Sequence, residues 1–475
     1  MLLENSPVPL VIGKDSIITK TLFDVFNPAL EQVSRQSSDA DSTHARAAVA
    51  SASKALETWR ETSAQKRRAI LFKAAEVIDR RYEELKQYMR QETGADDGWI
   101  DFNLATSKEC LLDCGGRIIT SEGKVTPLQN PSRAGLVVKE PYGVVFAMAP
   151  WNAPYILGFR AVLWPIAAGN TVVLKGSELS PCTLWAVCSV LQEAGLPDGV
   201  LNYLTCQPGN APEVTETIIA SKEVRKINFT GSTRVGSIVA QLAALHLKPV
   251  LLELGGKSPA IVCHDADLDI AGKECVLGAF LNSGQICMST ERILVHSSIY
   301  DEFIEKLRAW VSILFPDAND APVLIAASGA AKNRALVQDA LEKGASLVCG
   351  NLDATESTET RLRPLIIGNV APTMEIYSTE SFGPTVSLIK FEEEDEAVKI
   401  ANDTEYGLSS AVFSRDLRRA LKVAGKIESG AVHINHMTVG DDVSLPHGGA
   451  KASGFGRFGG GLDEWVRTKN ITYDL

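Results

Sequence analysis

The chain alternates between short apolar runs and amphipathic stretches from residue 143 onward, and this alternation limits the fold more than any other feature. Continuous apolar runs between turn residues are typical of strands that are buried on both faces of a sheet. One strand and one helix recur about every 25 residues, which predicts a doubly wound α/β region. The expected strands are 144–148, 171–174, 200–204, 226–229 and 249–253, and the expected helices are 154–168, 180–194, 213–220 and 233–245.

The alternation resumes after residue 253 and predicts a second α/β domain with its own sheet. Its expected strands are 260–263, 291–295, 346–349, 365–368 and 387–391, and its expected helices are 267–281, 300–314 and 330–343. In the N-terminal part, apolar residues at helical spacing predict helices at 44–62, 64–92 and 101–119. The stretch 465–473 is expected to form an extended arm.

Composition narrows the class of protein. With 47 basic and 58 acidic residues the formal net charge is −11, which argues against binding of nucleic acid or of an anionic membrane. The nine cysteines form no C-x-x-C motif and the seven histidines do not cluster with them, so we expect free thiols and no metal site. No leader segment or membrane-spanning run is recognised, and we expect a cytoplasmic protein.

Two glycine-containing segments are candidates for a phosphate site. Gly454, Gly456 and Gly459 match G-x-G-x-x-G, but they follow a loop rather than a strand, which favours a flexible glycine loop. The segment 229–236 (FTGSTRVG) follows a predicted strand and opens a predicted helix, where backbone N–H groups attract anions. An ordinary helix cap explains the segment equally well.

Three polar residues are candidates for chemistry. Cys287 lies in a polar loop beyond a predicted helix, whereas most other cysteines lie in apolar patterns typical of inert core thiols. Glu253 and Asn152 each lie at the end of a buried strand, where α/β proteins bind ligands. Taken alone, Glu253 is also explained as a solvated strand-end acid, and Asn152 as a turn residue.

Six segments in order resemble motifs of the NAD(P)-dependent aldehyde dehydrogenase superfamily over nearly the whole chain. They are 150–152 (PWN), 175–178 (KGSE), 229–233 (FTGST), 253–257 (ELGGK), 284–287 (GQIC) and 380–384 (ESFGP). The stretch 154–160 and the ending 461–464 are most similar to the aromatic aldehyde branch, which includes salicylaldehyde and vanillin dehydrogenases. The resemblance implies an aldehyde-dehydrogenase-like α/β fold, with two doubly wound domains and a small oligomerisation β-element.

The resemblance also implies catalytic roles. Cys287 would be the nucleophile that attacks the aldehyde carbon, giving a thiohemiacetal and then a thioester. The Asn152 amide and the Cys287 backbone N–H would hold the oxyanion, and Glu253 would activate the water that hydrolyses the thioester. The implied activity is NAD-dependent oxidation of an aromatic or polar aldehyde to the carboxylic acid.

The cofactor residues are implied in the same way. Lys175 and Glu178 would bind the adenosine ribose, and the Glu178 carboxylate favours NAD over NADP because it repels a 2′-phosphate. Glu380 would bind the nicotinamide ribose, and Phe382 would pack beside the ring. The other implied cofactor contacts are Trp151, Gly231, Ser232, Thr233, Arg234, Val235, Gly236 and Leu254.

Three residues are predicted to bind the aldehyde: Tyr155, Arg160 and His447. The family often has aromatic residues at the positions that align with Arg160 and His447. A polar, cationic pair there favours a phenolic, hydroxylated or carboxylate-bearing substrate. The alternative is that Arg160 forms an internal ion pair.

The resemblance assigns 1–121 and 143–253 to the dinucleotide-binding domain, 254–447 to the catalytic domain, and 122–142 and 448–475 to assembly into a homodimer or homotetramer. Alternatives are a CoA-acylating or NADP-preferring member of the family, and a non-catalytic structural homologue. Retention of Glu253 argues against CoA transfer, and retention of Cys287 argues against a purely structural role. A simple cysteine hydrolase would need a histidine base, and no histidine lies in a matching motif.

Overall fold

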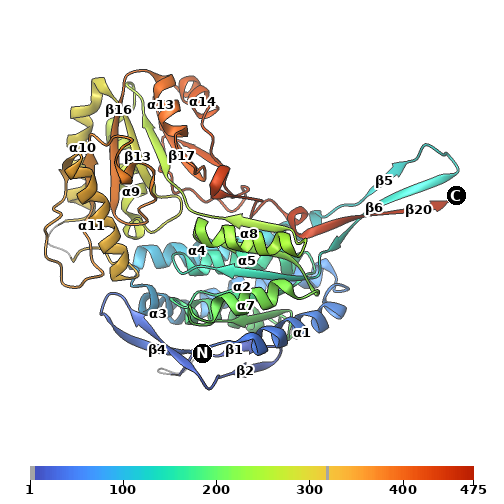
Figure 1. The fold of residues 1–475 in the computed structure, drawn as a ribbon. Coiled ribbons are helices and arrows are strands. Elements are labelled where there is room, and N and C mark those ends of the chain that lie inside the picture. The colour runs from blue at the N-terminus through green and yellow to red at the C-terminus, as the bar shows by residue number, and fades with distance from the viewer. Residues whose placement is uncertain (1–5, 317–319) are drawn as a thin grey trace.

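Two α/β lobes and a projecting arm make up the molecule (Figure 1). The computed structural model describes residues 6–316 and 320–475, so residues 1–5 of the segment examined for a leader lie outside it. Each lobe contains a mainly parallel sheet, and a separate three-stranded sheet forms the arm. The predicted fold class is therefore confirmed.

The sheet of the first lobe has eight strands in the order β19-β11-β10-β7-β8-β9-β1-β2. Its five central strands run parallel, whereas β19, β1 and β2 pair antiparallel at the two edges. The strands are β1 Leu10–Ile12, β2 Asp15–Ile17, β7 Val144–Ala149, β8 Thr171–Gly176, β9 Leu201–Leu204, β10 Val224–Thr230, β11 Val250–Glu253 and β19 Gly454–Phe455. A hairpin of β3 (Leu22–Asn27) and β4 (Gln32–Ser38) forms a small sheet of its own.

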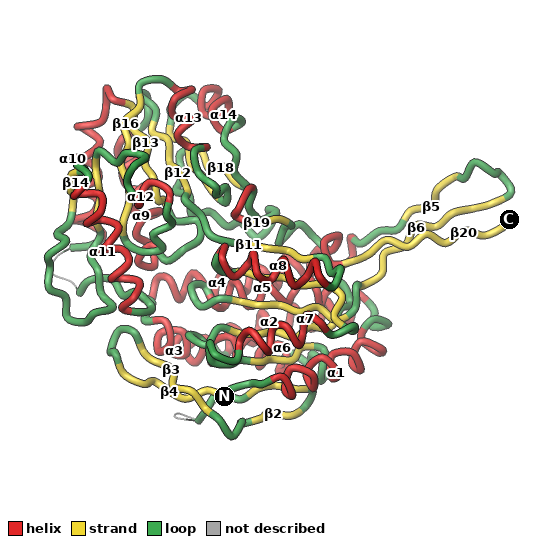
Figure 2. The backbone as a smooth tube through the Cα atoms, in the orientation of Figure 1, coloured by secondary structure: helices red, strands yellow, loops and turns green. Residues whose placement is uncertain are grey.

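Helices cover both faces of this sheet, because successive side chains of a strand point to opposite faces. In β7, Val145 and Ala147 pack into the core formed with α2 to α6, while Val144 and Phe146 pack into the core formed with α1, α7 and α8. The helices are α1 Ser42–Trp59, α2 Ala64–Arg80, α3 Tyr82–Thr93, α4 Asp97–Arg117, α5 Pro154–Ala167, α6 Pro181–Glu193, α7 Ala211–Ala220 and α8 Thr233–Leu245. Figure 2 shows these layers by element type.

One predicted helix is divided in two. The apolar spacing over 64–92 predicts a continuous helix, but α2 and α3 are separated at Arg81, whose backbone leaves the helical region (φ −102°, ψ 15°). The Arg81 guanidinium bonds Glu84 at 2.9 Å and Ser189 of α6 at 2.9 Å. The apolar spacing continues across Arg81, and its contact with Ser189 is distant in sequence, so the sequence pattern does not reveal the break.

The sheet of the second lobe has seven strands in the order β14-β15-β16-β13-β12-β17-β18, with only β14 antiparallel. Helices α9 and α10 cover one face, and α11 to α14 cover the other. The elements are β12 Ser258–Val262, α9 Leu268–Phe280, β13 Thr290–His296, α10 Tyr300–Leu314, α11 Ala327–Glu342, β14 Ser346–Cys349, β15 Leu365–Gly368, α12 Glu375–Ser378, β16 Thr385–Phe391, α13 Glu394–Asn402, β17 Ser409–Phe413, α14 Leu417–Ala424 and β18 Ala431–Ile434.

The arm consists of β5 (Lys124–Pro127), β6 (Arg133–Pro141) and β20 (Val466–Asp474), paired antiparallel in the order β20-β6-β5. It projects away from both lobes, with the C-terminus near its tip (Figure 1). The extended conformation predicted for 465–473 is thereby confirmed. The assignment of this arm to subunit assembly stays a prediction.

The glycine segment near the C-terminus begins with a two-residue edge strand, whereas Gly456 and Gly459 lie in bends after it, as the predicted loop requires. Gly454 and Phe455 (β19) pair with Glu253 and Leu252 of β11. Gly454 has φ +113°, and a Cβ there would lie 2.0 Å from the Leu252 carbonyl oxygen, so only glycine fits. This strand belongs to the first sheet although it lies in the range that the sequence analysis assigns to assembly.

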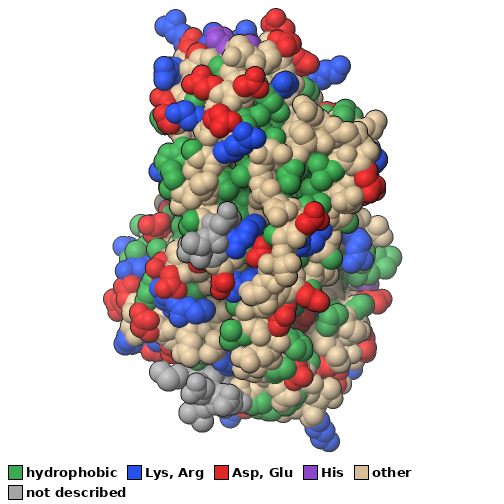
Figure 3. Space-filling view, turned by 90° about the vertical axis from the view of Figure 1, so that its left-hand side faces the viewer, with side chains coloured by type: hydrophobic (Ala, Val, Ile, Leu, Met, Phe, Trp, Pro, Cys, Tyr) green, Lys and Arg blue, Asp and Glu red, His purple; other side chains and the backbone are tan. Residues whose placement is uncertain are grey.

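On the face shown in Figure 3, acidic and basic side chains are interspersed over both lobes. Among residues 6–316 and 320–475, no helix combines the length and apolar character that crossing a membrane requires.

Candidate active site

Four parallel strands of the first sheet end at one edge, and predicted site residues follow those ends. β7 is followed by Pro150–Asn152, β8 by Ser177 and Glu178, and β10 by Gly231, while β11 ends on Glu253. The strand order β11-β10-β7-β8 places these segments next to one another. Ligands of open α/β sheets bind outside the carboxyl ends of the strands, so this edge is the expected ligand site.

Cys287, which precedes β13 of the second lobe, meets this edge. Its Sγ donates a hydrogen bond to Glu253 Oε1 at 3.0 Å, and the Thr230 hydroxyl donates to Oε2 at 3.3 Å. Glu253 is fully buried, whereas Cys287 is partly exposed. Burial raises the pKa of the Cys287 thiol well above its usual value, and the nearby Glu253 charge acts in the same direction. The arrangement is therefore a protonated thiol beside a carboxylate that can accept its proton.

Neighbouring groups stabilise the negative charge of Glu253. Burial by itself would raise the pKa of Glu253, but the charges of His447 and Arg160 and the Cys287 hydrogen bond hold it below its usual value of 4.5. Glu253 is accordingly a carboxylate near neutral pH, which is the form that a general base requires.

The backbone before Cys287 is strained. Residues 282–284 have φ values of 49°, 59° and 69°, a region that costs a residue such as Ser283 conformational energy. Side chains hold this conformation: Ser283 Oγ donates to the Val323 carbonyl at 2.8 Å, and Gln285 Nε2 donates to the same carbonyl at 3.2 Å. The loop that presents the thiol is thus fixed to the second lobe.

Asn152 joins the two lobes beside the thiol. It is buried, and its side-chain nitrogen donates to the Gln285 carbonyl at 3.0 Å. Its own backbone carbonyl accepts hydrogen bonds from Trp99 Nε1 at 3.0 Å and from Asn282 Nδ2 at 3.2 Å. A carboxamide has two N–H donors, so one of them can face a substrate oxygen while the other holds the loop.

The predicted phosphate segment opens α8. Ser232 accepts a hydrogen bond from the Val235 N–H at 3.4 Å and caps the helix, so the capping role that the sequence left open is present. At Gly236, a Cβ would lie 2.4 Å from Leu254, and the glycine therefore lets the helix pack against the end of β11. Of the remaining residues predicted here, Gly231, Thr233 and Val235 are half-buried and Arg234 is exposed.

Lys175 and Glu178 lie at the end of β8, and both are half-buried. The Lys175 Nζ lies 3.5 Å from the Gly176 carbonyl, a long contact that leaves the ammonium group available to a ligand. A cation and a carboxylate at one strand end suit the hydroxyl groups of a ribose.

A third group of predicted cofactor residues lies between the lobes. Glu380 Oε1 accepts the Gly256 N–H at 2.7 Å, and burial raises the pKa of Glu380 to about 7 although this hydrogen bond opposes the shift. Trp151 and Phe382 meet edge to face, with ring centroids 5.9 Å apart. A Cβ at Gly256 would lie 2.3 Å from the Cys287 carbonyl oxygen. The Glu380 carboxylate can accept hydrogen bonds, and the Trp151 and Phe382 rings can pack against a ligand. Together with the close backbone approach at Gly256, these groups fit a nicotinamide riboside beside the thiol.

A buried ion pair that the sequence motifs do not reveal holds two of these segments together. Lys257 Nζ and Glu291 Oε2 are buried and 2.6 Å apart. Glu291 also accepts the backbone N–H groups of Ser381 at 2.9 Å and Phe382 at 3.1 Å. The pair thereby fixes the 380–384 segment to the 253–257 segment. The only local signal was an acid at the start of an apolar strand.

Arg160 forms the internal ion pair that the sequence left open. Its guanidinium pairs with Asp441, and both side chains are buried. His447 lies beside this pair, with Nδ1 at 3.8 Å from Asp441 Oδ1 and Nε2 at 3.4 Å from Glu253 Oε1. Arg160 and His447 thus lie together near the predicted base, but the Arg160 charge is already balanced by Asp441, which the sequence analysis did not single out.

The role of Tyr155 in substrate binding stays a prediction. Tyr155 is fully buried in the core, and its hydroxyl donates to the Leu85 carbonyl at 2.7 Å. The hydrophobic core that contains Tyr155 is also the one against which Cys287 packs.

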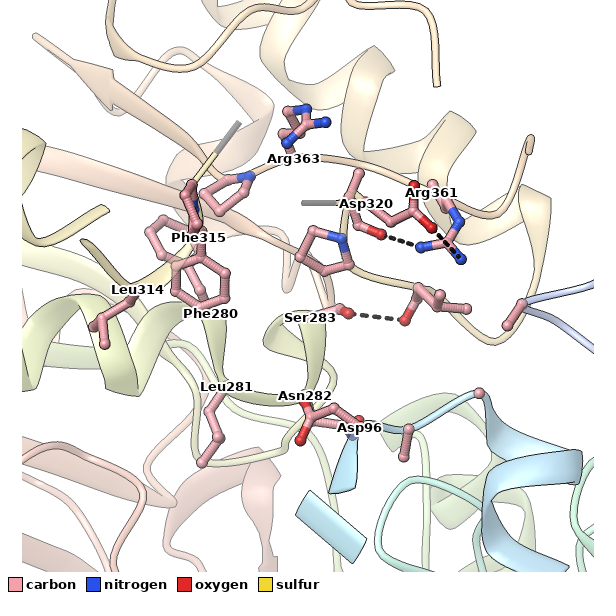
Figure 4. Close-up of a pocket in the computed structure, with 18 of the residues that line it drawn as sticks. Asp96, Phe280, Leu281, Asn282, Ser283, Leu314, Phe315, Asp320, Arg361 and Arg363 are labelled. Atoms are coloured by element: carbon pink, nitrogen blue, oxygen red, sulfur yellow. Dashed lines mark hydrogen bonds and ion pairs between the residues drawn. The ribbon is translucent and has the colours of Figure 1, made fainter. Parts of the chain in front are cut away.

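A separate cavity of about 490 Å³ lies near residues 281–283 but includes neither Cys287 nor Glu253. Asp96, Phe280, Asn282, Asp320 and Arg361 are among its lining residues (Figure 4). It borders the strained loop at residues 281–283, and none of the predicted catalytic residues lines it.

Comparison with known proteins places this geometry in a family. Residues 15–471 match the aldehyde dehydrogenase family. The chain is 42% identical over 462 residues to salicylaldehyde dehydrogenase of Pseudomonas putida, covering 95% of this chain and 94% of the relative. It is 42% identical over 460 residues to vanillin dehydrogenase of Pseudomonas fluorescens, covering 95% and 94%. A crystal structure of a salicylaldehyde dehydrogenase from Pseudomonas putida G7 complexed with salicylaldehyde superposes with TM-score 0.94 at 39% identity, over 98% of both chains.

The chain belongs to the aldehyde dehydrogenase family, and it is an NAD(P)-dependent aldehyde dehydrogenase. The predicted family, enzyme class and type of cofactor are confirmed by these matches.

Proposed function

We propose that this enzyme oxidises an aromatic aldehyde to the carboxylic acid with NAD, using Cys287 as nucleophile and Glu253 as base. The single observation that carries the proposal is the 3.0 Å hydrogen bond from Cys287 Sγ to Glu253 Oε1 at the carboxyl edge of the first sheet. Among the relatives described above, the substrates in the names are aromatic aldehydes.

In the proposed reaction, Cys287 gives up its proton to Glu253 and its thiolate attacks the aldehyde carbon. The Asn152 amide donates to the oxygen on which negative charge develops, a contribution of about 3 kcal/mol in comparable sites. When bound, the nicotinamide cofactor supplies the hydride acceptor that the oxidation requires. Loss of hydride from the former aldehyde carbon leaves a thioester on Cys287, and Glu253 then takes a proton from the water that hydrolyses it.

The preference for NAD over NADP rests on Glu178. Its carboxylate lies at the end of β8 and is half-buried, where it would accept hydrogen bonds from ribose hydroxyls and repel a 2′-phosphate. Lys175 acts weakly in the opposite direction. Parallel assays with NAD and NADP test this part of the proposal.

The functional test follows NADH absorbance with salicylaldehyde, vanillin and a straight-chain alkyl aldehyde. We expect the aromatic aldehydes to have the higher kcat/KM, Cys287→Ser to abolish turnover, and Cys349→Ser to retain it as a matched thiol control. Formation of acyl-CoA on addition of CoA would favour the acylating alternative. Absence of NADH with every aldehyde, in a folded protein, would refute the proposed function.

A further inference from the structure

A row of ionisable side chains extends from the thiol into the protein. Cys287 Sγ lies 3.0 Å from Glu253 Oε1, and the same oxygen lies 3.4 Å from His447 Nε2. On the other side of the imidazole, Nδ1 lies 3.8 Å from Asp441 Oδ1, and Asp441 pairs with Arg160. The proposed mechanism uses only the first two members of this row.

We propose that His447 is the second proton acceptor of the site, to which Glu253 passes the proton that it takes from Cys287. The inference rests on the proposed function. Because His447 acts through Glu253, it is a positioning residue for that carboxylate and its proton.

The two groups in direct contact are badly matched for a proton transfer. Burial raises the pKa of the thiol well above its usual value of 9.0, whereas the Arg160 charge and the Cys287 hydrogen bond act to lower the pKa of Glu253. Both groups therefore weaken the hold of Glu253 on a proton while His447 is still neutral. Imidazole, as a side-chain type, binds a proton about two pH units more strongly than a carboxylate does.

The fold holds the His447 ring in place. The His447 backbone forms two hydrogen bonds with Phe458, each 2.8 Å long. Only 10% of the side chain is exposed, and Nε2 makes no well-aligned hydrogen bond, so the 3.4 Å approach to Glu253 is its polar contact. Nε2 is therefore directed at the Glu253 carboxylate without a competing partner among the described residues.

Asp441 suits the role of a counter-charge. A carboxylate beside Nδ1 orients an imidazole and stabilises its protonated form, as in other histidine-based sites. Its pairing with Arg160 keeps the buried carboxylate charged, since burial alone would raise the pKa of Asp441 but Arg160 and His447 hold it below the usual value. A cavity of about 20 Å³ borders Arg160, Asp441 and His447, which is enough for about one water molecule.

The proton balance closes within the chain. The S–H bond of Cys287 breaks as an O–H bond forms on Glu253, and that O–H bond breaks as an N–H bond forms on His447 Nε2. The result is a thiolate, an ionised Glu253 and an imidazolium. After the imidazolium has released this proton to solvent, the same path can take the proton of the hydrolytic water, and Glu253 is ionised again for the next step.

Ionisable groups from every neighbouring element surround the His447 ring. They are Glu253 of β11, Cys287, Arg160 of α5, Cys110 and Asp113 of α4, His433 of β18, and Asp441 and Asp442 of the segment before His447. Histidine is the side chain in this set that ordinarily changes charge between about pH 5 and pH 8.

The test measures alkylation of Cys287 by iodoacetamide in the full-length protein, without aldehyde or cofactor, with mass spectrometry of the Cys287 peptide. In the wild type, we expect the rate to rise in a step between about pH 5 and pH 8 and then level off. In His447→Gln the step should be absent, and the rate at pH 7 should fall about tenfold or more, with a continued rise at alkaline pH. His436→Gln, an exposed histidine on the same segment, should retain the wild-type profile.

A second variant keeps the test decisive if His447→Gln is poorly folded. Asp441→Asn removes the counter-charge and should move the step to lower pH, a shift that a purely structural histidine does not predict. An unchanged profile in folded His447→Gln, or an unmoved step in folded Asp441→Asn, overturns the inference. If the enzyme forms NADH but the pH profile of Cys287 alkylation shows no histidine-dependent step, this inference alone is rejected. If alkylation shows the step but the enzyme forms no NADH, only the proposed function is rejected.

Discussion

At the scale of single residues, the site depends on contacts between side chains that are far apart in sequence. Asn152 and Glu253 come from strand ends of the first lobe, while Cys287 comes from a strained loop of the second. Asn152 bonds to that loop through the Gln285 carbonyl at 3.0 Å, so the same carboxamide that is proposed to face the substrate also holds the two lobes in register.

Replacement of Asn152 by alanine tests its proposed role. We expect Asn152→Ala to lower kcat about 100- to 1000-fold, because loss of one oxyanion donor has an effect of that size in comparable enzymes. The measurement is steady-state NADH formation, with thermal unfolding as the check of folding. Asn351→Ala, at an exposed turn, is the matched control. A loss of less than about threefold in a folded protein would be evidence against the role.

Motifs that are local in sequence were accessible without the structure, whereas partnerships across the fold were not. Cys287 and Glu253 each lie in a short recognisable segment, and their expected meeting is found. Nothing in the sequence pairs Asp441 with Arg160, Glu291 with Lys257, or His447 with Glu253, because each pair joins distant elements.

At the scale of elements, strands that form continuous apolar runs were predicted well from the sequence, whereas strands that mix apolar and polar residues were predicted poorly. β7 and β8 are buried continuous runs, and both were expected close to their observed bounds. β17 is also buried but begins with Ser409 and Ser410, whose polarity conceals the strand. β18 is only half-buried and contains His433. The alternation that indicates an α/β fold therefore survives the loss of several strands from the prediction.

The start of α6 depends on a carboxylate from α3. Buried Glu92 accepts hydrogen bonds from the N–H groups of Cys182 and Thr183, at 2.7 and 2.8 Å, and from the Thr183 hydroxyl at 2.7 Å. We expect Glu92→Ala to lower the free energy of unfolding by about 3 kcal/mol, because it leaves buried donors without partners. Chemical denaturation measures this, with exposed Glu83→Ala of the same helix as control. Equal midpoints for the two variants would contradict the capping role.

At the scale of the whole molecule, contacts within a single chain do not explain what stabilises the arm. All of β5, and every residue of β20 after Val466, are exposed, including Val125, Ile471 and Tyr473. A projecting three-stranded sheet with exposed apolar side chains has no core of its own to stabilise it. This supports the proposal that the arm contacts another copy of the chain.

Removal of residues 467–475 tests that proposal, since it deletes most of β20 and exposes the edge of β6. We expect light scattering to give the intact protein a mass that is a multiple of 51.1 kDa, and the truncated protein a mass near 51.1 kDa. Thermal unfolding shows whether the two lobes remain folded. A wild-type protein that is monomeric at micromolar concentration would contradict the proposal.

The central claim is that Cys287 carries the acyl group and that Glu253 is needed to release it, and trapping of the thioester tests this most directly. Glu253→Gln is mixed with NAD and salicylaldehyde, and the digested protein is examined by mass spectrometry. Acylation is expected to be slow because the thiol loses its proton acceptor, but the thioester accumulates because its hydrolysis loses the same base. The account predicts one salicyloyl group per chain on the Cys287 peptide and one NADH per chain. NADH formation with Cys287 unmodified, or with the acyl group on another residue, would contradict it.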